Sequence, residues 1–160
     1  MTKITIQATK SELNGLGVPP TTPETHQTAN VTEIFGEPIH IYTRQQAIEE
    51  GCLVDVTTTA AEAGLRYPVT LTREVWEDCV AWSAADSQRQ TYQDEAGRVW
   101  DVLWMARLAA RHGGERLAFQ LYRLPRGGRG VRPRLTILHM CIGPGDQGEP
   151  VITIMMPNED

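Results

Sequence analysis

Three apolar segments in the last third of the chain constrain its fold most. They span residues 117–124, 135–142 and 151–156, and glycine- and proline-rich runs separate them. Their β-branched and aromatic residues, with turn residues between them, predict three antiparallel strands. Apolar residues occupy both parities of these segments. We therefore expect helices to cover both faces of the sheet, or most of both.

Shorter elements are expected upstream of these strands, since apolar runs there alternate with capping and turn residues. In chain order they are a strand at 38–42, a helix at 44–50 capped by Thr43 and ended by Gly51, a strand at 52–56, a helix at 57–63 ended by Gly64, and a helix capped by Thr72 that runs to about Trp82. Helices that precede an antiparallel sheet indicate the α+β class.

The region from residue 90 to residue 111 reads as a hairpin followed by a helix. Residues 94–98 contain a glycine in a polar run, which predicts a tight turn and a small hairpin over 90–100. Asp101 is then expected to cap a helix that ends near Arg111. On that helix, Trp104, Arg107 and Arg111 are spaced to form one stripe.

One domain accounts for most of the 160 residues, because this length suits a single hydrophobic core. We expect a globular domain over residues 32–160. Residues 1–31 form a polar arm rich in proline and threonine, either disordered or packed in extended form along the domain. No apolar run is long enough to span a bilayer, and no signal peptide precedes the domain. The sequence therefore predicts a cytoplasmic protein that is not embedded in a membrane.

Basic residues are strongly segregated along the chain. Residues 107–134 hold eight arginines and one glutamate, a charge of +7, and since the whole chain carries −5 the remainder carries −12. Such a segment attracts acidic partners, and arginine suits bidentate contact with carboxylate or phosphate. The alternative is that the protein's own carboxylates neutralise it. The candidate partner-binding residues are Trp104, Arg107, Arg111, Arg123, Arg126, Arg129, Arg132 and Arg134, four of them on or beside the loop 125–133.

Catalytic, metal and cofactor motifs are not found in the sequence. The three cysteines, Cys52, Cys79 and Cys141, are widely spaced and read as buried thiols. The carboxylates of Asp146 and Glu149 share a glycine-rich turn, where a cation site is an alternative to the favoured plain hairpin turn. No serine lies in a nucleophile motif and no glycine-rich loop opens a helix. We therefore predict no catalytic residue, metal ligand or cofactor.

Four blocks of the sequence resemble an uncharacterised bacterial family, a domain of unknown function. They are residues 39–56 (IHIYTRQQAIEEGCLVDV), 68–80 (PVTLTREVWEDCV), 94–105 (DEAGRVWDVLWM) and 143–157 (GPGDQGEPVITIMMP). The resemblance implies a family found on plasmids, phages and other mobile elements. Proteins of this size from such elements often bind a host machine, so the resemblance implies an inhibitor or modulator and, in particular, anti-defence action such as anti-restriction or anti-CRISPR.

These observations lead to three hypotheses about function. The leading one is a non-enzymatic interaction protein that binds a host protein or nucleoprotein complex with an acidic surface. The second is an enzyme whose site the fold assembles, such as an NAD-using transferase similar to ADP-ribosyltransferases, with His40, Tyr42 and Arg44 near its entry. The third is direct binding of nucleic acid through the arginine loop, which the net charge of −5 opposes. A homodimer is left open.

Overall fold

The fold comes from a computed structural model that describes residues 41–159. These residues all belong to one compact unit. The predicted N-terminal arm, the domain start near Thr32 and most of the predicted strand at 38–42 lie outside the described residues. Ile41 and Tyr42, the last two residues of that strand, are irregular. No helix within residues 41–159 has the length and apolarity needed to cross a bilayer.

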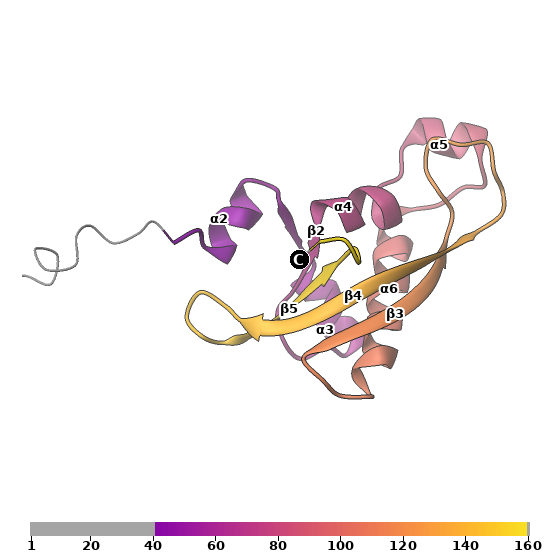
Figure 1. The fold of residues 1–160 in the computed structure, drawn as a ribbon. Helices are drawn as coiled ribbons and strands as arrows, with labels where there is room; N and C mark the ends of the chain where they lie inside the picture. Colours follow the sequence, from indigo (N-terminus) through magenta and orange to yellow (C-terminus); the bar gives the residue numbers. More distant parts are fainter. Residues whose placement is uncertain (1–40, 160) are drawn as a thin grey trace, which may run out of the picture. The chain divides into compact units, whose positions relative to one another are not determined.

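Five strands form one mixed sheet in the order β1-β2-β5-β4-β3 (Figure 1). Their bounds are β1 (Leu53–Asp55), β2 (Val69–Thr72), β3 (Arg116–Arg123), β4 (Arg134–Pro144) and β5 (Pro150–Met155). β2 and β5 are parallel, and every other neighbouring pair is antiparallel. The three predicted C-terminal strands are therefore confirmed, and with the helices they make an α+β fold.

The helices are short except for one. They are α2 (Arg44–Glu49), α3 (Thr57–Ala63), α4 (Arg73–Val75), a π-helical turn η1 (Trp76–Val80), α5 (Ala84–Arg89) and α6 (Glu95–Ala110). The predicted caps are confirmed, because the side chains of Thr43 and Thr72 accept hydrogen bonds from the first turns of α2 and α4. Gly64 ends α3 in the left-handed conformation, at φ 91°.

The hairpin predicted for residues 90–100 is wrong, and so is the cap at Asp101. Asp94 is the N-cap of α6, and its Oδ1 accepts a hydrogen bond from Gly97 N at 2.7 Å. A Cβ on Gly97 would lie only 3.1 Å from the Asp94 carboxylate, so the glycine makes room for the cap. Asp101 therefore lies inside the helix, two turns after its start.

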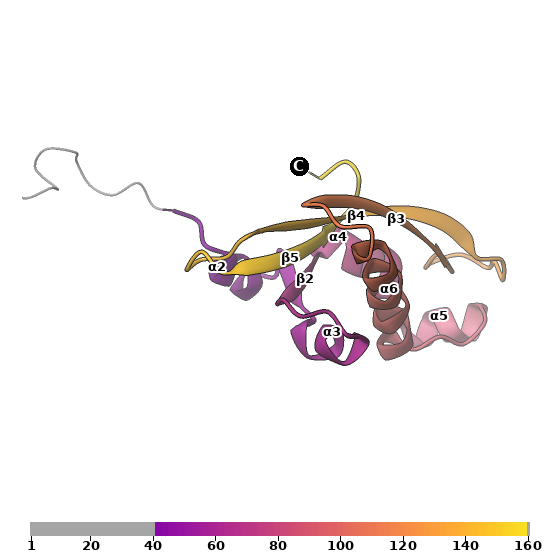
Figure 2. The ribbon, with the colours of Figure 1, turned by 90° about the horizontal axis from the view of Figure 1, so that it is seen from below.

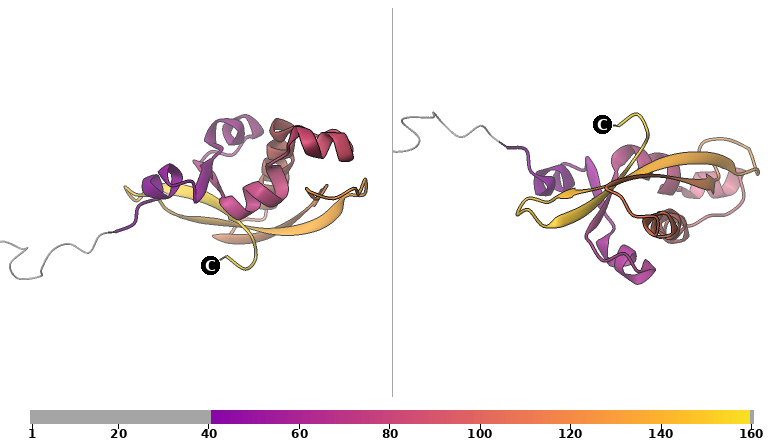
Figure 3. Two further views of the ribbon diagram at one scale, coloured as in Figure 1. Left: turned by 90° about the horizontal axis from the view of Figure 1, so that it is seen from above. Right: turned by 60° about the horizontal axis from the view of Figure 1, so that its bottom comes forward.

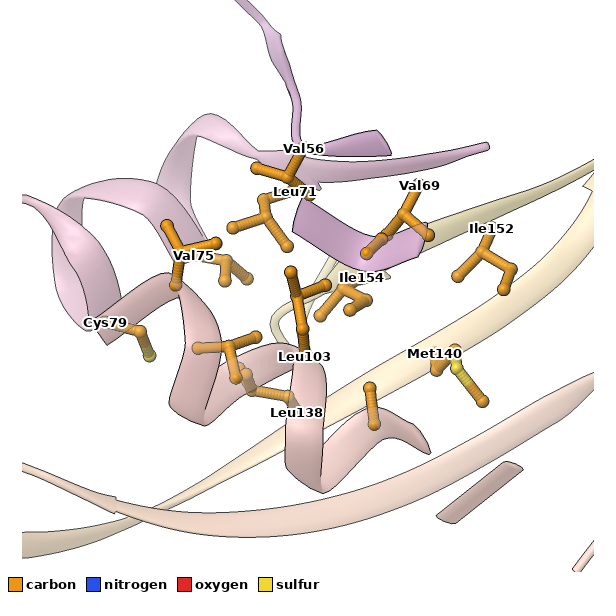
Figure 4. Close-up of a cluster of buried hydrophobic side chains, with 14 of the residues drawn as sticks. Val56, Val69, Leu71, Val75, Cys79, Leu103, Leu138, Met140, Ile152 and Ile154 are labelled. Atoms are coloured by element: carbon orange, nitrogen blue, oxygen red, sulfur yellow. The ribbon is translucent and has the colours of Figure 1, made fainter. Parts of the chain in front are cut away.

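The hydrophobic core lies between α6 and one face of the sheet. Val102, Leu103 and Ala106 of α6 are fully buried. Figure 4 shows Leu103 among side chains of β2, β4 and β5, including Leu71, Leu138 and Ile154. In Figure 2, α3 and α6 lie on the same side of the sheet, whereas the C-terminal end lies on the other side. The helices therefore cover one face.

The expectation that helices cover both faces of the sheet is wrong at the β3–β4 end. There Tyr122, Leu135 and Ile137 are 70%, 47% and 44% exposed on the face away from α6. Tyr122 pairs directly with Leu135 across the ladder. The helices α3 and α6 pack on the opposite face, which both views of Figure 3 show. An apolar row therefore remains open on the sheet.

Candidate partner-binding surface

Two of the predicted partner-binding arginines are neutralised inside the protein. Arg123 donates from Nε and Nη2 to the two carboxylate oxygens of Asp78, at 2.8 and 2.7 Å. Arg126 donates to Glu77 at 2.7 Å and to Asp86 at 3.4 Å. The interpretation that the protein's own carboxylates neutralise the arginines therefore holds for these two. Their role here is to attach the end of β3 and the start of the loop to η1 and α5.

Asp86 of α5 anchors the arginine loop. Its side chain is almost fully buried and forms a capping box with Ser83, whose Oγ lies 2.6 Å from Oδ2. Its other oxygen accepts a hydrogen bond from Gly127 N at 3.2 Å. The hydrogen bonds from the Ser83 hydroxyl and backbone, with those from Gly127 and Arg126, hold the pKa of Asp86 well below its usual range. The loop therefore begins from a fixed, ionised contact.

The remaining arginines of the loop region point to solvent. Arg129, Arg132 and Arg134 are exposed, and none forms an ion pair with a carboxylate of residues 41–159. Residues 125–132 of the loop, with Arg134 and Gln90, line an open hollow of about 670 Å³. This part of the surface therefore carries three positive charges that the described fold leaves unbalanced.

Trp104, Arg107 and Arg111 lie on the outer side of α6, as their spacing predicts. Trp104 stacks on Trp100 with ring centroids 6.2 Å apart, and the Arg107 guanidinium lies 5.2 Å from the Trp104 ring centroid. Arg111 is the exposed C-cap of the helix. The structure thus brings Trp104 and Arg107 together into a cation–π pair, while Arg111 stands at the helix end.

An apolar groove that was not predicted from the sequence lies beside these residues. The groove, of about 420 Å³, lies between α6 and β3 and is lined by Asp101, Trp104, Met105, Gln120, Leu121, Tyr122 and Leu135. Burial raises the pKa of the Asp101 carboxyl. One signal was available, since Gln120 and Tyr122 alternate with the apolar Phe119 and Leu121 and so mark the exposed face of β3. Leu135 and Ile137 carry no such signal, because both are as apolar as core residues.

The two turn carboxylates that suggested a cation site have structural contacts. Asp146 accepts hydrogen bonds from Arg44 N at 2.7 Å and Gln45 N at 3.0 Å, so it caps the start of α2. Glu149 accepts from Gln147 N within the same turn at 2.9 Å. Within residues 41–159, no group of three or more histidine, cysteine, aspartate and glutamate side chains is arranged to hold a metal ion.

The cysteines differ in burial, contrary to the prediction that all three are buried. Cys79 is buried, and the loss of hydration raises the pKa of its thiol to about 12. Cys52 is exposed and Cys141 is half-buried. A thiol with so high a pKa is protonated at neutral pH, so Cys79 is a poor nucleophile.

Tyr42 and Arg44, the described members of the enzyme hypothesis, make contacts within the fold. The Tyr42 hydroxyl donates to Glu50 at 2.8 Å. The Arg44 guanidinium donates to Thr153 Oγ1 at 3.0 Å and to the Ile152 carbonyl at 3.1 Å, which ties α2 to β5. Partial burial lowers the pKa of Arg44. His40 lies outside the described residues.

Comparison with known proteins gives a family and no individual relative. Neither the curated proteins nor the solved structures contain a match to this chain. A family model described as a family of unknown function, DUF6573, matches residues 30–160. This match extends over most of the chain and includes all four blocks that suggested an uncharacterised family. The chain therefore belongs to DUF6573, a family of unknown function.

Proposed function

We propose that this protein is a non-enzymatic interaction protein that binds an acidic surface on a host protein or nucleoprotein complex. One observation carries the proposal: the unbalanced arginines Arg129, Arg132 and Arg134 lie on or beside the loop that joins β3 to β4, and these two strands carry the exposed apolar row of Tyr122, Leu135 and Ile137. Arg134 and Leu135 are consecutive in β4 and so project to opposite faces, which places the loop charge at the end of the strand and the apolar area along its open face.

This combination matches the composition of protein interfaces. Tyrosine, tryptophan and arginine are enriched among the residues that contribute most to binding, and charged residues at the rim steer the encounter. The stacked pair Trp100 and Trp104, with Arg107 over Trp104, adds aromatic area on the neighbouring side of α6. Under this proposal Arg123 and Arg126 are not contact residues, because the carboxylates of Asp78 and Glu77 occupy them.

The proposal includes a biological setting that follows from the sequence resemblance. If the family is carried by plasmids and phages, a host defence complex is the partner class that a small binding protein without a catalytic motif would act on. The mobile-element origin and the anti-defence role are parts of the proposal that the capture experiment below addresses through the identity of the partner.

Direct binding of nucleic acid is a second candidate, and the arginine-lined hollow beside Gln90 favours it. Phosphate contacts release counterions, so three arginine contacts predict that log affinity falls against log salt with a slope of about −3. The net charge of −5 opposes this candidate over most of the surface. The salt slope measured on a random duplex and a random single strand separates it from protein binding.

The test is affinity capture of the tagged full chain from host lysate, with and without nuclease. We expect a nuclease-resistant complex that Arg129→Glu and Arg132→Glu each weaken without lowering the melting temperature. Arg66→Glu is the matched control, since Arg66 is an exposed arginine in the loop between α3 and β2 and its reversal changes the net charge equally. Equal capture by the wild type and all three variants would remove the arginine loop from the proposal. Capture that disappears with nuclease would favour binding of nucleic acid.

A further inference from the structure

β3 is an edge strand with an unused side. It pairs with β4 on one side, and no other strand of residues 41–159 pairs with it. The Ile142 amide donates to the Glu115 carbonyl, so residues 115, 117, 119, 121 and 123 direct their backbone groups toward β4. By alternation, the amides and carbonyls of Ala118, Gln120 and Tyr122 point away from β4, and none has a backbone partner within the described part of the chain.

This edge lacks the features that usually protect an edge strand. Natural edges are short, charged, kinked by proline or bulged, since an unpaired strand recruits other chains. The central segment 117–122 of β3 contains no charged residue and no proline, and its register with β4 is continuous over eight pairs. A regular, uncharged edge of this length is suited to accept another strand.

A groove for side chains lies along the same edge. Trp104 and Met105 of α6 form one wall, and Gln120, Leu121 and Tyr122 of β3 form the other. An added strand directs alternate side chains to opposite faces of the sheet. One set would enter this groove of about 420 Å³, and the other set would lie beside the exposed Tyr122, Leu135 and Ile137. Both positions favour apolar side chains on the incoming strand.

Charge specifies one end of that strand. The loop with Arg129 and Arg132 follows β3 directly, and Arg134 opens β4 opposite Arg123. Acidic residues are therefore favoured where the incoming strand reaches this end. Among the residues that line the groove the only acidic one is Asp101, whose carboxyl oxygens can accept a hydrogen bond from an amide or a hydroxyl.

A second copy of the chain fits this edge less well than an acidic segment does. Antiparallel pairing of two β3 strands would bring the arginine loop of one copy next to the other copy's Arg111, at the end of α6 that leads into β3. Each end of the shared sheet would then combine those arginines with Arg111 and the single carboxylate of Glu115, and the net positive charge would lower affinity. An acidic partner meets no such repulsion.

We propose that the edge of β3 binds an extended, acidic segment of the partner protein by strand addition, with its apolar residues in the groove against α6. This inference rests on the proposed function and specifies how the partner is held. Main-chain hydrogen bonds to Ala118, Gln120 and Tyr122 would supply affinity, and the groove and arginines would supply selectivity.

The experiment selects peptides that bind the full chain from a display library of random linear eight-residue peptides. The selected peptides, called winners below, are synthesised and their dissociation constants are measured. We expect winners with apolar residues at alternate positions and aspartate or glutamate at one end. Gln120→Pro removes an outward amide without breaking the ladder to β4, so it should weaken these peptides about tenfold or more. Gln120→Thr keeps that amide and is the matched control, which should bind like the wild type.

A second measurement does not depend on how the proline variant folds. Methylating alternate backbone nitrogens of the winning peptide should abolish its binding to the wild-type protein, while methylation of the other set should have little effect. Winners that bind equally to Gln120→Pro and after methylation of either set would overturn the inference, as would an absence of winners. A dimer seen by light scattering, and lost in Gln120→Pro, would assign the edge to a second copy and also overturn it.

The outcomes for the two proposals are separable. A host complex that is lost with Arg129→Glu and Arg132→Glu but retained by Gln120→Pro would support the proposed function and reject strand addition. Loss with the arginine variants and with Gln120→Pro, together with retention by Gln120→Thr, would support both. Retention by the arginine variants together with loss in Gln120→Pro would leave the edge as the contact and remove the arginines from it.

Discussion

The two faces of β4 differ in how deeply their side chains are buried. Leu138 is fully buried against α6, whereas its neighbour Ile137 is 44% exposed on the opposite face. Both side chains are large and apolar, so the difference comes from what covers each face. One face packs in the core, and the other carries apolar side chains that no described element covers. This difference in burial distinguishes residues that stabilise the fold from residues that a partner can contact.

The arginines show the same division. Arg98 is buried, donating to the carbonyls of Val80 and Leu124 at 2.9 and 3.1 Å and lying 4.8 Å from the Trp82 ring centroid. Burial lowers its pKa. Arg132 lies exposed on the loop. Arginine therefore acts as a hydrogen-bond donor within the core and as an exposed positive charge on the loop.

The largest difference in the free energy of unfolding is expected between alanine substitutions of Leu138 and Ile137, neighbours on β4. Leu138→Ala leaves a cavity at the centre of the core and should lower the free energy of unfolding by about 3 kcal/mol. Ile137→Ala removes a half-exposed side chain and should cost about 1 kcal/mol or less. Urea unfolding of both variants measures the difference. Similar losses for the two would show that the open face is packed in solution, by a second copy or by another part of the chain.

Replacing the buried arginine should have the next largest effect. Arg98→Met keeps most of the side-chain volume but leaves the carbonyls of Val80 and Leu124 without their donor, which should cost about 2 kcal/mol. Arg132→Met is the control and should be close to neutral. Thermal unfolding gives both values. A stable Arg98→Met would mean that water reaches these carbonyls and replaces the guanidinium.

The sequence predicted the positions of helices and strands better than it predicted which other parts of the chain these elements contact. Turn and capping residues located the three C-terminal strands, and Thr43, Thr72 and Gly64 marked helix ends correctly. The run at 94–98 failed, since an aspartate followed three residues later by glycine suits a turn as well as a helix cap. The distinction depends on whether the following residues pack, and Val102 and Leu103 do so only against residues far away in the sequence, in the sheet and the other helices.

Long-range pairing explains the remaining errors at the site. Arg123 and Arg126 find their carboxylates 40 to 49 residues upstream, at Asp78, Asp86 and Glu77. Nothing in the spacing of eight arginines shows which of them the fold neutralises. The open face of the sheet was missed for a related reason, because apolar residues on both parities show that two faces are apolar but not that both are covered.

The remaining prediction concerns Asp86, which anchors the arginine loop to α5 and whose contribution to stability depends on pH. Because hydrogen bonds from Ser83, Gly127 and Arg126 stabilise the ionised Asp86, its pKa in the folded protein lies below the ordinary value of 3.8. A carboxyl with a depressed pKa adds stability that is complete above its unfolded pKa and is lost as the pH falls through the folded pKa. Asp86→Asn should therefore be less stable than the wild type at about pH 7, and the gap should narrow only below about pH 4.

Urea midpoints at neutral and acidic pH measure that gap, and Glu77→Gln provides the comparison. Glu77 also binds Arg126, at 2.7 Å, but it is half-exposed and no hydrogen bond from Gly127 reaches it. We expect its loss to change stability less, since exposed ion pairs contribute little. If the gap for Asp86→Asn were independent of pH, the ionised carboxylate would not be the contact that fixes the loop, and the arginines would be displayed on a more mobile segment.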